Sequence, residues 1–149
     1  MTSITAIANN FFAACETGKG WEACKAYCAP NATFAAQAEP LEGIKTLAEY
    51  TDWMKGLMTI MPDGSYEVKS FATDTERNNV TAYAVFSGTH TGPGGPCEPT
   101  GKQTTSDYEL WSKVGDGGNR KGGISWGCLT PPLLHRRSDM PCPKITSSS

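Results

Sequence analysis

Apolar residues recur at helical spacing in the N-terminal part of the chain. Between residues 3 and 16 they fall three or four positions apart, and Ser3 is a suitable N-cap: Ile4, Ile7, Phe11, Phe12 and Cys15. Gly18 and Gly20 follow, so the pattern predicts an amphipathic helix over residues 3–16. A short helix is predicted over residues 21–28, ended by Pro30 and Asn31.

The strongest helical pattern covers residues 44–61. Its apolar positions share one helix face: Ile44, Leu47, Thr51, Met54, Leu57, Met58 and Met61. The segment 62–64, Pro-Asp-Gly, ends it. Core packing is one interpretation of the methionines and leucines of this face. The other is that some of them form the wall of a ligand pocket, because thioethers adapt to irregular apolar ligands.

Four segments have strand character. Residues 32–37 form a weak strand, residues 65–73 alternate as a partly exposed strand, and residues 75–79 form a turn. Residues 79–86 are β-branched or aromatic, and both faces are largely apolar. We expect this strand to be covered on one side by the core and on the other by a second subunit. Residues 102–111 form its antiparallel partner.

The loop between the last two strands carries His90, one of only two histidines in the chain. Pro93, Pro96 and Pro99 lack amide donors, so this segment is neither helix nor strand. Histidine is the side chain best suited to move protons near neutral pH without a cofactor. A histidine at a strand end is otherwise an ordinary solvated residue, and the pattern alone leaves both interpretations open.

The residues around this histidine carry a family resemblance. The segment 88–92 (GTHTG), followed by PTG at 99–101, resembles the strand–loop–strand signature of SnoaL-like polyketide cyclases, which belong to the nuclear transport factor 2-like superfamily. The upstream order of helices fits as well, over residues 1–112. The resemblance implies a cone-shaped, cystatin-like α+β fold: three N-terminal helices on a curved, mostly antiparallel sheet. It also implies an apolar pocket, a homodimer and no cofactor, but not one activity.

Candidate site residues follow from the resemblance and from strand alternation. His90 is the expected base or donor, and Tyr108 the expected donor on the partner strand. Asp107 and Tyr108 must face opposite sides, and burying an unpaired carboxylate is costly, so we expect Tyr108 to point inward. Asp52 is the other acid with a route inward. Expected ligand-binding residues lie on one strand, the third helix and the histidine's strand: Phe34, Tyr50, Trp53, Met54, Leu57 and Phe86.

Two function classes fit these residues. In an enzyme, a base removes a proton next to a carbonyl and a donor stabilises the enolate, for an aldol cyclisation or an isomerisation. In a binding or dimerisation module, or in a truncated inactive relative, the same apolar cone holds a small molecule without converting it. A carboxylate within hydrogen-bond reach of His90 favours the enzyme, and a solvent-facing His90 favours the binder.

Composition excludes several partners. The 149 residues suit one domain, and the net charge of −2 argues against nucleic acid and against an anionic membrane surface. There is no apolar run of membrane-spanning length, and the first residues lack the features of a secretory signal. We therefore expect a cytoplasmic protein whose six cysteines are thiols, and, because no Cys-x-x-Cys pair occurs, no bound metal.

The chain changes character after residue 113. Acidic residues predominate up to Lys113 and basic residues afterwards, and the segment 115–123 resembles a linker. The resemblance implies further strands here, one bearing a tryptophan and a catalytic acid, and that motif is missing. We therefore expect a domain over residues 1–113 and a poorly ordered tail over 114–149. Codons for Lys113 and Val114 are compatible with a splice donor, so translated intron or a shifted reading frame is one interpretation of the tail.

Overall fold

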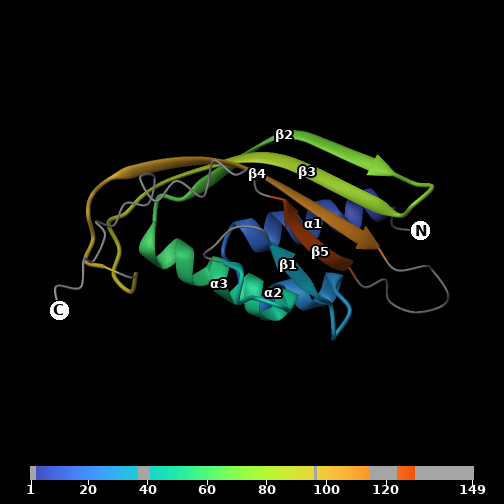
Figure 1. Cartoon of the computed structure of the whole chain (residues 1–149), viewed down its shortest axis with the longest axis horizontal. Helices are drawn as coiled ribbons and strands as arrows, with labels where there is room; N and C mark the ends of the chain where they lie inside the picture. The colour runs from blue at the N-terminus through green and yellow to red at the C-terminus, as the bar shows by residue number, and fades with distance from the viewer. Residues whose placement is uncertain (1–2, 37–40, 96, 115–123, 130–149) are drawn as a thin grey trace.

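The computed structural model describes residues 3–36, 41–95, 97–114 and 124–129. Three helices, α1 (Ile4–Glu16), α2 (Trp21–Cys24) and α3 (Leu47–Ile60), accompany a curved sheet of five strands. The strands are β1 (Phe34–Ala36), β2 (Ser65–Asp74), β3 (Asn79–Thr89), β4 (Gln103–Val114) and β5 (Ile124–Leu129), and a 3₁₀ helix, Lys25–Tyr27, follows α2. Figure 1 shows the long strands β2, β3 and β4 arching over the helices.

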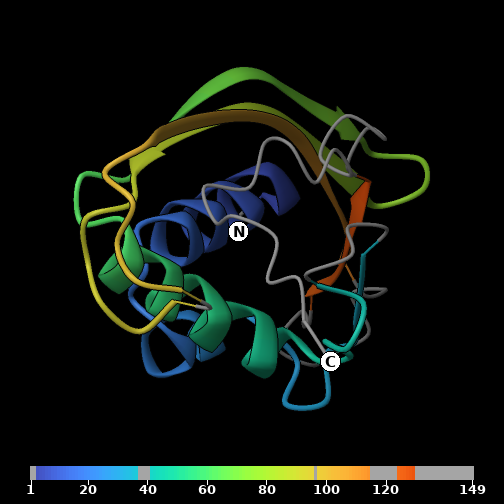
Figure 2. The same cartoon turned by 60° about the vertical axis from the view of Figure 1, so that its left-hand side comes forward.

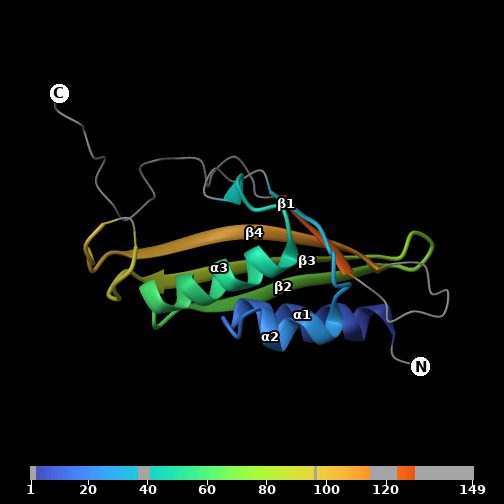
Figure 3. The ribbon, with the colours of Figure 1, turned by 90° about the horizontal axis from the view of Figure 1, so that it is seen from below.

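The sheet has the order β1-β5-β4-β3-β2. All neighbours are antiparallel except β1 and β5, which are parallel. Seen along the strands, the sheet curls around α1 and α3 (Figure 2), and the view from below shows the three helices together on one side of it (Figure 3). This arrangement confirms the predicted α+β cone with N-terminal helices on a mostly antiparallel sheet.

The alternation of β3 explains which face of the sheet is concave. Its even-numbered residues from Val80 to His90 are all buried, and the odd-numbered ones are half-buried. On β4, Tyr108 pairs with Ala84 and Leu110 pairs with Ala82, so these side chains share the buried face. Small alanines on β3 leave room for the helices, because α1 packs across the sheet with Phe11 and Phe12 fully buried.

The third helix begins later than its apolar pattern predicts. Thr46 forms a capping box with Glu49: the Thr46 hydroxyl accepts from the Glu49 amide at 3.2 Å, and the Glu49 carboxylate accepts from the Thr46 amide at 3.1 Å. Such reciprocal bonds satisfy amides that the first helical turn leaves unpaired. The residues before Thr46, including Ile44, therefore form the turn that enters α3, although Ile44 still packs against the core.

The structure describes one strand inside the segment that was expected to form a tail. β4 extends to Val114, and β5, inside the expected tail, lies between β4 and β1. A sheet that lacked its closing strand would leave β4 unpaired on one edge, and β5 fills that place. The interpretation of residues 114–149 as translated intron or a shifted reading frame stays a prediction. The rest of the expected tail lies outside the described residues.

The capping box yields a prediction about stability. Thr46→Ala removes the side chain that accepts from Glu49, and it should lower the free energy of unfolding by about 1 kcal/mol, the usual value of such a cap. Thr59→Ala is the matched control, since Thr59 lies exposed in the same helix, and it should change stability by less than about 0.5 kcal/mol. Urea denaturation of both variants measures the difference, and equal stabilities would contradict the assigned role of Thr46.

Candidate functional site

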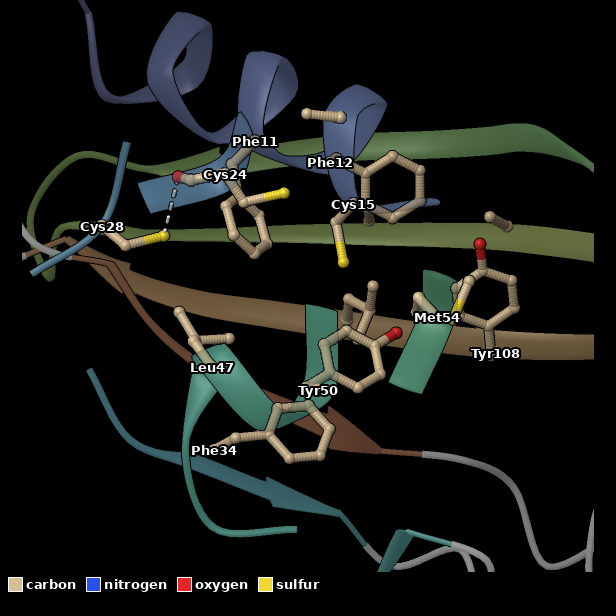
Figure 4. Packing of buried hydrophobic residues seen from close by; sticks show 14 of the residues in the cluster. Phe11, Phe12, Cys15, Cys24, Cys28, Phe34, Leu47, Tyr50, Met54 and Tyr108 are labelled. Carbon is tan, nitrogen blue, oxygen red and sulfur yellow. Dashed lines mark hydrogen bonds between the residues drawn. The ribbon is translucent and has the colours of Figure 1, made fainter. Parts of the chain in front are cut away.

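A buried carboxyl group lies where α1, α3 and β4 meet. Glu16, the last residue of α1, is 2% exposed. The hydroxyl of Tyr50, from α3, donates to its Oε1 at 3.1 Å, and the hydroxyl of Tyr108, from β4, donates to its Oε2 at 2.7 Å. In Figure 4 the two tyrosine rings approach from α3 and β4 below the end of α1. Each oxygen of the carboxyl group thus has a phenol donor from a different element.

The position of Glu16 follows from the spacing of α1. Glu16 is four residues after Phe12 and next to Cys15, both of which are buried, so it continues the apolar face by one more helical turn. The sequence prediction missed Glu16 because it treated this face as apolar residues only. The available signal was an acidic residue in register with an apolar stripe, at the C-terminal end of a helix, where the helix dipole disfavours negative charge.

Burial dominates the ionisation of this group. Removal from water raises the pKa of Glu16 to about 7, although the hydrogen bonds from Tyr108 and Tyr50 lower it by stabilising the carboxylate. The pKa of Tyr108 is raised well above its usual value, first by burial and then by the negative charge of Glu16. Glu16 therefore exchanges its proton near neutral pH while Tyr108 stays a phenol, which is the division of roles that acid–base chemistry requires.

Aromatic rings surround the carboxyl group. Phe34 stacks on Tyr50 with ring centroids 4.2 Å apart, and Trp53 lies parallel to Tyr50 at 6.4 Å. On the other side, Phe12 stacks on Tyr108 at 6.4 Å. Tyr50, one of the expected ligand-binding residues, is therefore in contact with two others, Phe34 and Trp53.

The other expected wall residues lie on α3 and β3. Met54 and Phe86 are buried, and Leu57 is half-buried. All three belong to the core or pack against it. Their predicted contact with a ligand stays a prediction.

The strand prediction for Tyr108 is confirmed in its geometry. Tyr108 is 7% exposed on the concave face, whereas Asp107 is exposed on the opposite face and accepts a bond from the Tyr83 hydroxyl at 3.2 Å. The strand alternation therefore gave the right inward residue. Its hydrogen-bond partner, Glu16, lies 92 positions earlier in the chain.

His90 occupies a different part of the concave face. It is 1% exposed, directly after β3, and its Nδ1 lies 3.2 Å from the Thr100 hydroxyl and accepts from the Thr100 amide at 3.4 Å. His90 is six residues after Ala84, the partner of Tyr108, so it lies about 20 Å from that alanine along the direction of β3. Among the described residues, the ring bonds to Thr100 and to no carboxylate, and it is not solvent-facing, so neither outcome expected for this residue is observed.

Asp52 does not point inward as expected. It is exposed, and its Oδ1 accepts from the backbone amide of Trp21 at 3.0 Å. Trp21 is the first residue of α2, so the Asp52 carboxylate satisfies an amide at the start of that helix. The physical reason is its place on α3, where Asp52 lies between the inward positions Tyr50 and Met54 and faces α2. The structure therefore brings Asp52 together with neither His90 nor Tyr108.

The cysteines divide into two groups. Cys15, Cys24 and Cys28 are free and buried, as predicted for structural thiols, and burial raises the pKa of Cys28 to about 12. Cys97 is disulfide-bonded, so the prediction that all six cysteines are thiols is wrong for this residue. Within the described residues, no three cysteine, histidine or acidic side chains are placed to hold a metal ion, and no helix is long and apolar enough to cross a membrane.

Comparisons with known proteins agree with this fold. A family model described as SnoaL-like polyketide cyclase matches residues 6–117. AclR from Streptomyces galilaeus is 19% identical with a TM-score of 0.66, and the match covers 95% of this chain and 85% of AclR. An NTF2-like protein from Burkholderia thailandensis is 20% identical with a TM-score of 0.66, over 91% and 95% of the two chains. IdmH from Streptomyces antibioticus is 18% identical with a TM-score of 0.64, over 89% and 95%. No curated protein matches the chain.

The buried carboxyl group predicts a distinctive dependence of stability on pH. Because the pKa of Glu16 is about 7 in the folded protein and 4.5 for an ordinary solvated glutamate, unfolding releases its proton between these values, and stability falls as pH rises. The loss should be roughly 3 kcal/mol between pH 4.5 and pH 7, with little further change above.

The variant Glu16→Gln has no such proton and isolates the effect. The difference in the free energy of unfolding between wild type and Glu16→Gln, from urea titrations at several pH values, should follow this curve. A difference that is constant across the range, or that grows in favour of wild type with rising pH, would show that burial does not raise the pKa of Glu16.

Proposed function

The chain belongs to the SnoaL-like polyketide cyclase family, and from this membership we propose that it converts a small organic carbonyl compound by cofactor-free acid–base chemistry. The observation that carries the proposal is the Glu16 carboxyl group, 2% exposed, with a pKa of about 7 and a phenol donor on each oxygen. Family membership supports cyclase- or isomerase-type chemistry in general, and the carboxyl group supplies a specific proton acceptor.

In the proposed reaction, the Glu16 carboxylate removes a proton from the carbon next to the substrate carbonyl, and the electron pair of the C–H bond becomes an enolate. In a cyclisation, the enolate carbon attacks a second carbonyl of the same molecule, and the new alkoxide takes the proton back from Glu16. In an isomerisation, the proton returns to a different carbon. Either route balances without an oxidant or a metal, and the carboxylate form of Glu16 is regenerated at the end.

The two tyrosines have distinct parts in this proposal. Tyr108, at 2.7 Å, holds the carboxylate and lowers the pKa that burial has raised, and Tyr50, at 3.1 Å, makes the longer bond of the two. The longer bond is the one that exchanges more readily for a developing enolate oxygen, and the stack of Tyr50 between Phe34 and Trp53 orients its ring. Phe34 of β1 and Trp53 of α3, both expected ligand-binding residues, would then contact the apolar part of the substrate. The catalytic role expected for His90 stays a prediction beside this assignment.

A non-catalytic binding module is the alternative, and one observation favours it. Both oxygens of Glu16 are already bonded to tyrosines, so the group also connects α1, α3 and β4 as a structural element. In that case a ligand would bind over the aromatic rings and leave the carboxyl group untouched. Replacement of Glu16 separates the two functions, because only the enzyme depends on its proton.

The catalytic proposal predicts the behaviour of Glu16 variants. Incubation with aryl ketones and diketones in D₂O, followed by mass spectrometry, should reveal a compound whose α-protons exchange or which cyclises. Glu16→Gln should lower that rate by about 10²- to 10⁴-fold, the range for loss of a general base. Full activity of Glu16→Gln on the same compound would contradict the role of Glu16 as the base. Binding of these compounds by the wild type without exchange or cyclisation would leave the binding module as the function.

The pH profile tests the role of Tyr108 separately. In wild type, the rate should rise with pH through about 7, because the carboxylate form of Glu16 is the base. Tyr108→Phe removes a donor that stabilises the carboxylate, so the midpoint should move to higher pH. Tyr50→Phe is the matched control. Because Tyr50 makes the longer bond to Glu16, its loss should shift the midpoint of the pH profile less. An unchanged midpoint in Tyr108→Phe would contradict this assignment.

The outer face of the sheet supports the expected homodimer. Tyr83 and Val85 of β3 point away from the helices and are half-buried, and Trp111 of β4, beside Thr81, is 36% exposed. Water contact with such side chains is unfavourable, and a second copy of the sheet would cover them.

We expect light scattering to give the mass of a dimer at tens of micromolar, roughly where weak dimers form. Trp111→Glu should convert it to the monomer, because a charge at the interface centre opposes association. Lys19→Glu, an exposed position beyond α1, is the control and should leave the mass unchanged. A wild-type protein that is monomeric at this concentration would exclude the dimer.

A further inference from the structure

The ring of His90 has one bonded nitrogen and one unbonded nitrogen. Its Nδ1 accepts from the Thr100 amide, and the Thr100 hydroxyl itself accepts from the Lys102 amide at 3.3 Å. An N–H can only donate, so Nδ1 is an acceptor and the ring proton is on Nε2. Nε2 is buried and has no hydrogen-bond partner among the described residues. A buried N–H without a partner is rare in folded proteins, and such a group calls for a partner that binds from outside.

The space beside Nε2 is bordered by Gly95, by the side chain of Ile60 and by the Cys97 carbonyl oxygen, which would lie 3.7 Å from a Cβ on Gly95. A Cβ added to Gly95 would lie 3.3 Å from Nε2 and 3.5 Å from Cγ2 of Ile60, so the glycine hydrogen faces the unbonded nitrogen. Any side chain at this position would cover it. The residue that faces the Nε2–H is therefore a glycine, which belongs to one turn of backbone.

That turn, Thr91–Gly95, touches α3 closely at one point. The Gly92 amide donates to the Ile60 carbonyl at 2.9 Å, and a Cβ on Gly92 would lie 1.9 Å from the Thr59 carbonyl oxygen. Thr91, Pro93 and Gly94 are exposed. The turn is thus held against the end of α3 by a contact that only a glycine permits.

The base of the turn is fixed by separate bonds. The His90 amide donates to the Lys102 carbonyl at 3.0 Å, and Gly101 donates to the His90 carbonyl at 2.8 Å. The preceding residue, Thr89, donates to Asp63 from both its amide and its hydroxyl at 2.7 Å. The ring of His90 is therefore held in place by its own backbone and by Thr100 when the turn moves.

We infer that His90 is a ligand-binding residue, whose Nε2–H donates to an oxygen acceptor, a carbonyl or a carboxylate, of a small molecule that enters when Thr91–Gly95 separates from α3. The subsite lies on the same concave face as Ala84 of β3, the partner of Tyr108, but about 20 Å from that alanine along the strand direction. Binding at this subsite does not depend on the chemistry proposed at Glu16. It binds either one end of an elongated substrate or a separate small ligand.

Nitrogen NMR of protein labelled with ¹⁵N-histidine tests the inference on the full chain. The His90 signals are identified by their loss in His90→Phe, and they should show the proton on Nε2. Sodium benzoate and acetophenone are the probes that carry an oxygen acceptor, and toluene is the probe without one. We expect one or both acceptors to shift the His90 Nε2 signal saturably and toluene to leave it unchanged. No shift with either acceptor, or an equal shift with toluene, overturns the inference.

Two glycine variants and one control locate the binding. Gly95→Ala places a methyl group in front of Nε2 and should weaken probe binding at least tenfold. Gly92→Ala cannot keep its contact with Thr59 and should tighten binding several-fold by opening the turn. Thr91→Ala, exposed in the same turn, should bind as wild type does. Amide spectra that are unchanged outside residues 89–102 establish that each variant folds. Wild-type affinity in both glycine variants overturns the inference, because the probe would then bind elsewhere.

Discussion

The burial of one carboxyl group links three elements of this fold that are far apart in sequence. Glu16 ends the first helix, Tyr50 lies in the third and Tyr108 lies near the middle of the fourth strand, and their hydrogen bonds join all three elements inside the curved sheet. A carboxyl group in such a place requires donors, because an unpaired buried charge is far more costly than a paired one. The positions of α1 and α3 relative to β4 are therefore constrained by two bonds as well as by apolar packing.

The fold was largely predictable because its signals are local. Helical spacing located α1 and α3, and alternation located β2 to β4. The errors arose where non-local contacts decide the outcome. The start of α3 is set by the Thr46–Glu49 capping box and not by Ile44. The strand Ile124–Leu129 contains Gly127, a poor strand former, and it pairs with β1, some 90 positions away in sequence, and with β4. No periodicity within six residues indicates such partners.

The site was predictable only in part, for a related reason. Strand alternation gave the inward orientation of Tyr108, and the helix pattern placed Tyr50 among the aromatic residues that line the group. Glu16 was missed because a sequence shows that an acid lies on an apolar face, but not that two hydroxyls from other elements will meet it. Asp52 was chosen by its proximity in sequence to Trp53, whereas its orientation depends on the start of α2.

A structural role alone does not explain why the residue at position 16 is an acid. A glutamine has the same shape, offers an oxygen to one tyrosine and can donate its amide to the hydroxyl oxygen of the other, so it would connect the same three elements. It would also avoid the loss of stability that a carboxyl group with a pKa near 7 suffers as pH approaches neutrality, roughly 3 kcal/mol, which is a large fraction of the net stability of a small domain. The amide lacks a proton that can be transferred near neutral pH. Functional sites are where proteins retain such locally unfavourable groups, and this comparison of two nearly isosteric side chains is the physical basis for assigning the proton transfer to Glu16.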